Sequence, residues 1–217
     1  AQEIKALYNS GAARVGASRA PSASDSLQQG LVGWWTFDGP DLINNVADKS
    51  GNGNTGYMLG FTSTSSAQVP GKLGQALDFD GSSNYVYLSS SPITDYVASS
   101  SACMWLNTTD ESNSSGGYGT RFFNFYQDAN NYLNVGYTSH RFFTTHRSQG
   151  TSCGKYTISG SQATNDIWQF YCYTWDGSTV RQFVDGYYVT SNDNSYAADA
   201  TNVIGTRSST QGHFEGR

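Results

Sequence analysis

Three glycines between residues 50 and 56 offer the first candidate for chemistry. The stretch SGNGNTG has the spacing G-x-G-x-x-G, which in dinucleotide-binding domains lets the backbone approach a pyrophosphate. That fingerprint requires a buried parallel strand before the first glycine and a helix after the third. Here a polar stretch, DLINNVADK, precedes the glycines, and YMLGFTSTSSAQVPG follows them without helical periodicity. The spacing therefore predicts a tight turn, and a nucleotide site is excluded.

The same loop has the composition of a calcium site. Calcium takes six to eight oxygen ligands from carboxylates, amides and backbone carbonyls. Asp48 opens the loop, Asn52 and Asn54 add amide oxygens, and Asp38 ends the preceding apolar run. These four residues form the predicted metal site, with a structural calcium ion as its cofactor. The alternative is an Asx-turn, in which Asp48 accepts hydrogen bonds from the next backbone N–H groups.

The histidines and cysteines have no catalytic spacing. His140 and His146 share parity on HRFFTTH, a pattern that can bind a metal but is more often a pair of surface side chains. Cys103, Cys153 and Cys172 fit no zinc or C-x-x-C pattern. Cys103 and Cys172 both lie in strand-like runs, so a cross-strand disulfide forms if the fold brings them together. Buried free thiols are the alternative.

Composition narrows the class of partner. Charged residues make up 13% of the chain and the formal net charge is −5, with no cluster of lysine and arginine. This excludes nucleic acid as a partner. No apolar run approaches the roughly 18–20 residues of a membrane span, so membrane insertion is not expected. Low lysine and glutamate with abundant serine, threonine, asparagine and glycine favour an exported protein, extracellular or at the cell surface.

The elements that must position these residues are short strands. From Leu31 onward, apolar and aromatic runs recur every 8–15 residues, separated by Gly, Asn, Asp and Ser turns. This cadence predicts an all-β fold, an antiparallel two-sheet jelly-roll sandwich. The runs expected to be strands are LVGWWTF, QALDFDG, NYVYLSS, ACMWLNT, RFFNFYQ, YLNVGYT, RFFTTH, KYTISGS, WQFYCYTWDG, TVRQFVDGYYV and NVIGTR. Residues 2–9 predict a short N-terminal helical tail, and a small-polar linker follows it to residue 29.

Several blocks in order resemble a known family. LVGWWTFDG, ADKSGNGNTGYMLG and PGKLGQALDFDGSSNYVYL resemble the opening half of a laminin G-like jelly roll, of the concanavalin A-like lectin/glucanase superfamily. IWQFYCYTWDGSTVRQFVDG resembles its central hairpin, although Gln169 stands where the family usually has histidine. Because the family often carries calcium at the rim of the sandwich, the resemblance supports the metal site at Asp48.

The resemblance also implies where the domain begins and ends. EIKALYNSG resembles the helical tail that follows the family's last strand, and no counterpart of that last strand precedes Arg217. We therefore expect residues 1–29 to be the tail of a preceding unit plus a linker, and residues 30–217 to be a jelly roll lacking its last strand. A sheet edge left open in this way would accept another strand. A neighbouring repeat of the same chain is then one expected partner.

Glucanases of this fold are implied to need two strand-borne glutamates four residues apart, acting as nucleophile and acid/base. Glu3, Glu111 and Glu215 are the chain's glutamates, and E-x-D-x-x-E does not occur. The sequence therefore predicts no enzyme activity of this type. Carbohydrate recognition typically pairs flat rings with convergent polar side chains. The candidate ligand-binding residues are Tyr126, Tyr132, Tyr137, Asn124, Asn131 and Asn134.

These observations predict a non-catalytic recognition or adhesion module of an exported surface protein, with a glycan or a surface protein as partner. Two alternatives remain open. One is a structural spacer repeat that binds no small ligand, in which the Tyr/Asn-rich sheet is plain surface. The other is a glycan-active enzyme with an unfamiliar site.

Overall fold

The strands of the protein were located in a computed structural model. It describes Ile4, Lys5, Tyr8 and residues 29–43, 45–108, 120–138, 141–157, 164–189, 191–193, 203–205 and 215–216. The strands are β1 (Gly56–Leu59), β2 (Gln68–Pro70), β3 (Gln75–Leu77), β4 (Phe79–Asp80), β5 (Tyr85–Leu88), β6 (Ser100–Leu106), β7 (Thr120–Asp128), β8 (Asn131–Thr138), β9 (Arg141–Ser148), β10 (Thr151–Thr157), β11 (Gln169–Trp175), β12 (Val180–Val184), β13 (Tyr187–Val189), β14 (Ser191–Asp193), β15 (Val203–Ile204) and β16 (Glu215–Gly216). Two short helical turns also occur, η2 (Gly39–Asp41) and α2 (Thr64–Ala67).

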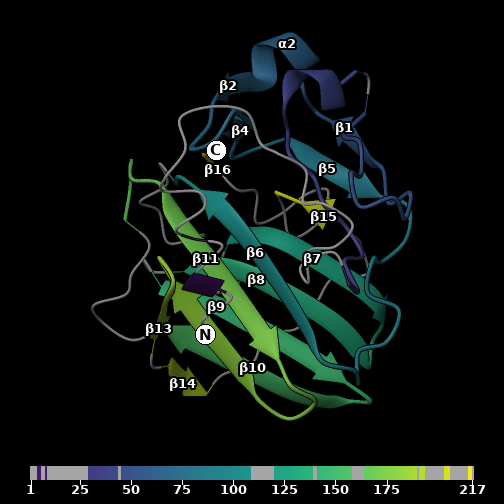
Figure 1. Ribbon diagram of the computed structural model, residues 1–217, viewed down its shortest axis with the longest axis vertical. Helices are drawn as coiled ribbons and strands as arrows, with labels where there is room; N and C mark the ends of the chain where they lie inside the picture. The colour runs from purple at the N-terminus through teal and green to yellow at the C-terminus, as the bar shows by residue number, and fades with distance from the viewer. Residues whose placement is uncertain are drawn as a thin grey trace.

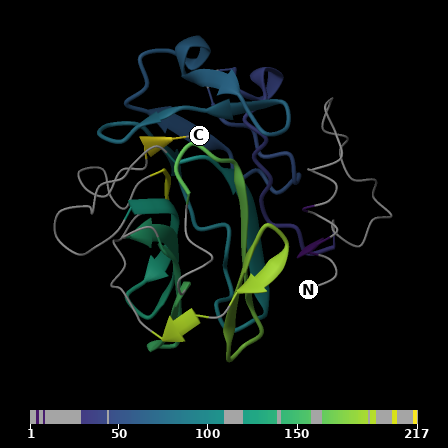
Figure 2. The ribbon, with the colours of Figure 1, turned by 90° about the vertical axis from the view of Figure 1, so that its left-hand side faces the viewer.

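Two antiparallel sheets form a sandwich, as the cadence of the sequence predicted (Figure 1). The large sheet has eight strands in the order β1-β5-β15-β7-β8-β9-β10-β14, and the small sheet has four in the order β13-β12-β11-β6. Seen edge-on, they form two layers (Figure 2). None of the described helices is long and apolar enough to cross a membrane.

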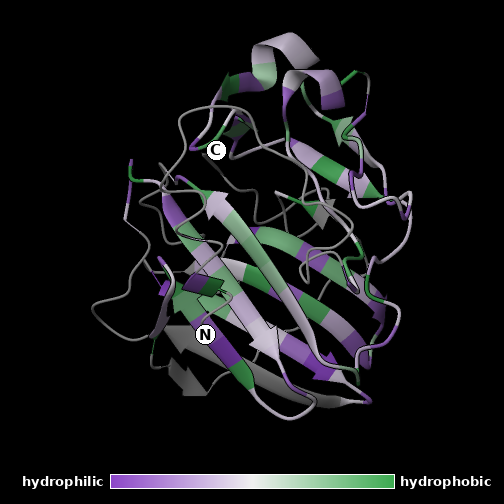
Figure 3. Ribbon diagram, viewed as in Figure 1, coloured by the Kyte–Doolittle hydropathy of each residue, from purple (hydrophilic) through white to green (hydrophobic). Residues whose placement is uncertain are grey.

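The register of the large sheet separates its two faces. Paired residues in neighbouring strands point to the same face, and successive residues in a strand point to opposite faces. One row of paired residues faces the small sheet and belongs to the apolar core: Met58, Val86, Ile204, Phe123 and Val135. Figure 3 shows hydrophilic and hydrophobic residues interleaved along the strands of this sheet. Each fully buried Val, Leu or Phe contributes about 1.5–3 kcal/mol to folding.

A polar bridge crosses the core between the sheets. Tyr171 of β11 is fully buried, and its hydroxyl accepts a hydrogen bond from Gln182 Nε2 at 2.7 Å. The same hydroxyl lies 2.5 Å from Thr144 Oγ1 of β9. Burial raises the pKa of Tyr171, and these hydrogen bonds only partly offset that effect. The neutral phenol therefore links three strands of the two sheets.

One predicted strand is not found. The run LVGWWTF, residues 31–37, pairs with no described strand. Instead, the backbone N–H of Trp34 donates to Asp48 Oδ1 at 2.9 Å, and the carbonyl of Trp34 accepts from Lys49 N at 2.8 Å. The loop that contains Asp48 and Lys49 therefore holds this run in place. The backbone groups of Trp34 that a neighbouring strand would bond are used by this loop instead.

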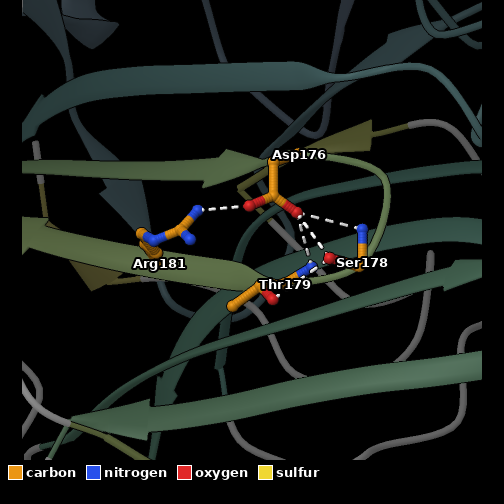
Figure 4. A network of polar contacts seen from close by, with 4 residues as sticks. All are labelled: Asp176, Ser178, Thr179 and Arg181. Carbon is orange, nitrogen blue, oxygen red and sulfur yellow. Dashed lines mark hydrogen bonds and ion pairs between the residues drawn. The ribbon is translucent and has the colours of Figure 1, made fainter.

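Two Asp-Gly turns connect the strands of the small sheet. Asp185 and Gly186 connect β12 to β13 with φ of 52° and 81°, the left-handed pair that a two-residue hairpin needs. At the other turn Asp176 accepts hydrogen bonds from the backbone N–H groups of Ser178 and Thr179 and forms an ion pair with Arg181 (Figure 4). These carboxylate contacts fix the β11–β12 hairpin, so the two strands start in register.

The expected N-terminal helix lies mostly outside the described residues and stays a prediction. Its described part packs on the outer face of the small sheet, where Ile4 is buried against Phe170, Cys172 and Phe183. The Tyr8 ring lies 5.8 Å from that of Trp105. Figure 2 shows this described part, in purple, on this side of the sandwich.

His146 faces the core instead of the surface, and His140 lies outside the described residues. The imidazole of His146 stacks on Trp175 with ring centroids 4.4 Å apart. Its Nε2 lies 2.8 Å from the carbonyl of Tyr96, so the neutral ring donates there. Burial lowers the pKa of His146, and the hydrogen bond to Tyr96 only partly opposes this.

This burial predicts a pH dependence of stability. Because the folded pKa of His146 lies below the unfolded value near 6.5, its stabilising contribution is present above that value. The contribution is lost as the pH falls through the folded pKa. We expect urea unfolding between pH 7.5 and 5.5 to show falling stability. The His146→Phe variant should show a flatter profile, and an unchanged slope would contradict the assignment.

Candidate functional site on the outer face of the large sheet

A row of side chains runs across the outer face of the large sheet, perpendicular to the strands. Successive pairings place Tyr57 beside Tyr87, Asn124 beside Asn134, and Asn134 beside Thr145. The backbone of Val203 joins the two halves, since it pairs with both Tyr87 and Asn124. Neighbouring strands lie about 4.8 Å apart, so the five side chains lie in one line, with the position of Val203 between Tyr87 and Asn124. We call this line the outer row.

The two ends of the outer row differ in exposure. Tyr57 and Tyr87 are 45% and 39% exposed, so their rings are available to a ligand. Asn124 and Asn134 are fully buried. Neither the amide nitrogen nor the amide oxygen of Asn134 has a hydrogen-bond partner among the described residues. Leaving such a group unsatisfied costs about 1–3 kcal/mol, so the buried amide needs a polar partner, such as an ordered water molecule.

A glycine keeps this face compact beside the outer row. The ring of Phe143 lies over Gly136, where an added Cβ would meet the carbonyl of Thr120 and the ring carbons of Phe143. The guanidinium of Arg121 in turn lies 5.2 Å from the Phe143 ring centroid. Packing therefore fixes the positions of the large side chains beside the outer row, and they give the row a rigid support.

The structure brings most of the predicted ligand-binding residues together. Asn124 and Asn134 form the centre of the outer row, and Tyr126 pairs with Tyr132 on the same face two residues further along. The guanidinium of Arg147 lies 5.8 Å from the Tyr132 ring centroid. These residues share one face of the sheet, where Asn124, Asn134 and Tyr132 are buried and Tyr126 is half-buried.

Two predicted residues lie elsewhere. Asn131 belongs to the turn between β7 and β8, where its amide donates to Asp128 and its oxygen accepts from Gln149 N. Tyr137 points into the core, 2% exposed, where it stacks on Phe122 and accepts a hydrogen bond from Thr108. The structure therefore does not bring Tyr137 to the outer row.

Three members of the outer row were missed from the sequence: Tyr57, Tyr87 and Thr145. The available signal was alternation, since GYML and YVYL place tyrosines at every second position beside buried Val86 and Leu88. Which face those tyrosines occupy depends on pairing through β15, far away in the sequence.

The glycine-rich loop adopts turn geometry. Gly51 and Gly53 have φ of 89° and 77°, which glycine adopts without a Cβ penalty. Gly56 begins strand β1, where a dinucleotide fingerprint would begin a helix. The expected turn is confirmed.

Asp48 organises this loop. Its Oδ1 accepts from the backbone N–H groups of Trp34 and Ser50, and its Oδ2 accepts from the Ser50 hydroxyl and from Asn54 N, all within 2.9 Å. Partial burial raises the pKa of Asp48, but the hydrogen bonds from Ser50, Trp34 and Asn54 outweigh it and hold the pKa below its ordinary value. The Asx-turn that the sequence offered as an alternative is therefore present.

The other predicted metal ligands are only partly gathered here. The amides of Asn52 and Asn54 donate to the carbonyls of Leu31 and Val32. Asp38 instead accepts from Gln75 N, beside a different turn. Within the described residues, no group of three or more His, Cys, Asp or Glu side chains could hold a metal ion. Calcium at Asp48 stays a prediction.

A disulfide joins Cys103 to Cys172, which are paired directly across β6 and β11. The cross-strand pairing that the sequence left open is thus formed. Among the glutamates, Glu215 lies in β16 opposite Asp80, and Glu3 and Glu111 lie outside the described residues.

A family profile decides the relationship. The profile described as the concanavalin A-like lectin/glucanases superfamily, of laminin G type, matches residues 80–217, more than half of the chain. The chain belongs to this superfamily. No curated protein sequence matches the chain.

Solved structures of this superfamily's fold resemble the chain at low sequence identity. Domain 4 of AbnA, an extracellular GH43 arabinanase from Geobacillus stearothermophilus solved with arabinotriose, has 18% identity and a TM-score of 0.57 over 80% of this chain and 83% of that one. The binding domain of Paraclostridial Mosquitocidal Protein 1 has 13% identity and a TM-score of 0.55, over 81% and 43%. The receptor binding domain of botulinum neurotoxin C/D mosaic serotype has 13% identity and a TM-score of 0.52, over 76% and 41%. These likenesses show the fold.

The loop geometry predicts the effect of Asp48→Asn. One acceptor oxygen is lost, so the unfolding free energy in EDTA should fall by about 1–3 kcal/mol in urea titrations. Asp95→Asn, at an exposed Asx-turn away from this loop, is the matched control.

If calcium also binds, the stability loss of Asp48→Asn should grow in millimolar calcium, because the ligand stabilises only the folded state. An equal loss in both conditions would contradict the calcium prediction, and no loss would contradict the role of Asp48.

Proposed function

We propose that the domain is a non-catalytic carbohydrate-binding module of an exported protein, and that it binds a neutral oligosaccharide along the outer row. The observation that carries this proposal is the exposed end of the outer row, where the rings of Tyr57 and Tyr87 lie side by side, in line with the buried, unsatisfied amide of Asn134. Sugars offer both an apolar ring face and hydroxyl groups that donate and accept hydrogen bonds. Tyrosine rings and amides match those two surfaces.

The charge of the site favours a neutral ligand. The outer row contains no ionisable cation, and the chain carries a net charge of −5, so a polyanionic glycan gains little attraction. That domain 4 of AbnA was solved with arabinotriose supports an oligosaccharide of a few units. From β1 to β9 the outer row crosses six strands, which is five strand spacings or roughly 24 Å, long enough for a short oligosaccharide.

The disulfide and the relatives support export. Cross-strand disulfides persist in oxidising compartments outside the cytosol. The arabinanase with the similar domain 4 is extracellular, and the similar neurotoxin domain binds a receptor. The metal proposal at Asp48 is independent of the sugar site, since it concerns the loop before β1.

The exposed rings give the direct test. Tyr87→Ala should weaken oligosaccharide binding about tenfold, since it removes a stacking surface worth roughly 0.5–1.5 kcal/mol or more. Tyr188→Ala is the matched control, because Tyr188 is 58% exposed on the small sheet. The affinity of each variant is measured by calorimetric titration with arabinotriose, xylotriose and maltotriose. A heparin hexasaccharide is the anionic comparison.

Neither variant should change thermal stability much, because both side chains are exposed at the surface. Equal loss of binding in both variants would contradict the site. Binding of no oligosaccharide would contradict the function and favour a structural spacer. Preference for the heparin fragment would contradict the neutral ligand.

A further inference from the structure

One chemically reactive pair of residues in the chain has no part in the sugar site. Asn52 is followed by Gly53, and nowhere else in the sequence does glycine follow asparagine. An asparagine side chain can react with the backbone nitrogen of the next residue. Glycine hinders that ring closure least, because it has no Cβ. Both Asn52 and Gly53 are exposed, in the loop before β1.

The backbone between these two residues is free to reach the reactive geometry. Among the residues that the structure describes, none forms a hydrogen bond with the N–H of Gly53 or with the carbonyl of Asn52. Gly53 has φ of 77°, and nothing lies within 4 Å of the position that a Cβ there would take. The nitrogen that must attack is therefore accessible, and a ring that forms on it meets no neighbour.

Asn54, in the same loop, has the opposite arrangement. Its N–H donates to Asp48 Oδ2 at 2.9 Å, and its carbonyl accepts from Trp35 Nε1 at 2.8 Å. These bonds fix the peptide groups on both sides of its Cα, so its side chain cannot swing over the next nitrogen. The next residue is Thr55, whose branched side chain crowds that nitrogen further. Asn52 and Asn54 are thus a matched pair within one loop.

We propose that Asn52 is a site of spontaneous deamidation, which converts it to aspartate and isoaspartate. The Gly53 nitrogen gives its proton to solvent and forms a bond to Cγ of Asn52. The bond between Cγ and Nδ2 breaks, and the amide leaves as ammonia with a proton from water. The resulting succinimide ring takes up one water molecule and opens at either of its carbonyls. Water is the only co-reactant.

The amide that is lost bonds the loop to the run that precedes it. Asn52 Nδ2 donates to the carbonyl of Leu31 at 2.7 Å and to Ser50 Oγ at 3.1 Å. A carboxylate in its place has no hydrogen to donate, and it brings a negative charge toward Asp48, which accepts from the Ser50 hydroxyl at 2.8 Å. Isoaspartate also lengthens the main chain, which then passes through the side-chain methylene. Deamidation should therefore loosen the hold of this loop on residues 31–37.

Ageing followed by mass spectrometry tests the site. Wild-type protein kept in warm, mildly alkaline buffer with EDTA should gain about 1 Da, because OH replaces NH₂, and peptide mapping should place the gain at Asn52. In H₂¹⁸O the gain should be about 3 Da, since water opens the ring. Labelling by an isoaspartyl methyltransferase should identify isoaspartate at the same position. Asn52→Gln should stay unmodified there, because its side chain would have to close a larger, less favourable ring.

The variant Thr55→Gly separates the effect of structure from that of sequence. It gives Asn54 a following glycine too, while the bonds to Asp48 and Trp35 still fix its backbone. In the folded variant we expect Asn52 to react roughly tenfold faster than Asn54, and in urea the two should react alike. Equal rates in the folded variant would overturn the structural argument. No gain at Asn52 in the folded wild type would overturn the proposal itself.

The consequence is measured on the aged protein. Ion exchange separates the deamidated form, which carries an added negative charge, from the unmodified form. The deamidated fraction should unfold at a lower urea concentration, and its Trp35 indole N–H resonance should shift, because that group donates to Asn54. Aged Asn52→Gln protein should keep its starting midpoint, which excludes other ageing as the cause. Equal midpoints for the two wild-type fractions would overturn the part of the proposal that makes Asn52 an anchor of residues 31–37.

Discussion

The rest of the structure depends on the register between β7 and β8. In this pair Asn124 faces Asn134 while Phe123 and Phe125 face Val135 and Leu133, so polar and apolar rows take opposite faces. A bulge between Arg121 and Phe123 makes Phe122 the extra residue on β7. The Phe122 ring stacks on Tyr137. Slipping this pair by one residue would send the asparagines into the core and the phenylalanines to the outer face.

That register has consequences on both sides of the sheet. Inside, it sets β9 so that Thr144 meets Tyr171 and His146 meets Trp175, which holds the two sheets together. Outside, it aligns tyrosines from β1 and β5 with amides from β7 and β8, although these strands are far apart in the sequence. A binding row built on a sheet is rigid, because every position is fixed by ladder hydrogen bonds and by the core beneath it.

The sequence predicted the strands and hairpins well, because their signals are local: alternation, and Asp-Gly at turns such as Asp185 and Gly186. It misplaced LVGWWTF, whose apolar pattern suits a strand although its backbone bonds Asp48 and Lys49. Tyr137 was grouped with Asn134 because YLNVGYT mixes aromatic and polar residues on both faces. Tyr137 lies on the same face of β8 as Leu133 and Val135. That this face is the buried one follows only from the packing of the two sheets.

The outer row is the central claim, and the side-chain amide of Asn134 reports on it most directly. Its NH₂ resonances can be followed by NMR in ¹⁵N-labelled protein during titration with the oligosaccharide that binds most tightly. The account predicts saturable shifts of the Asn134 side-chain amide together with the backbone amides of Tyr57 and Tyr87. Saturable shifts confined to the small sheet, with the Asn134 amide unchanged, would contradict it.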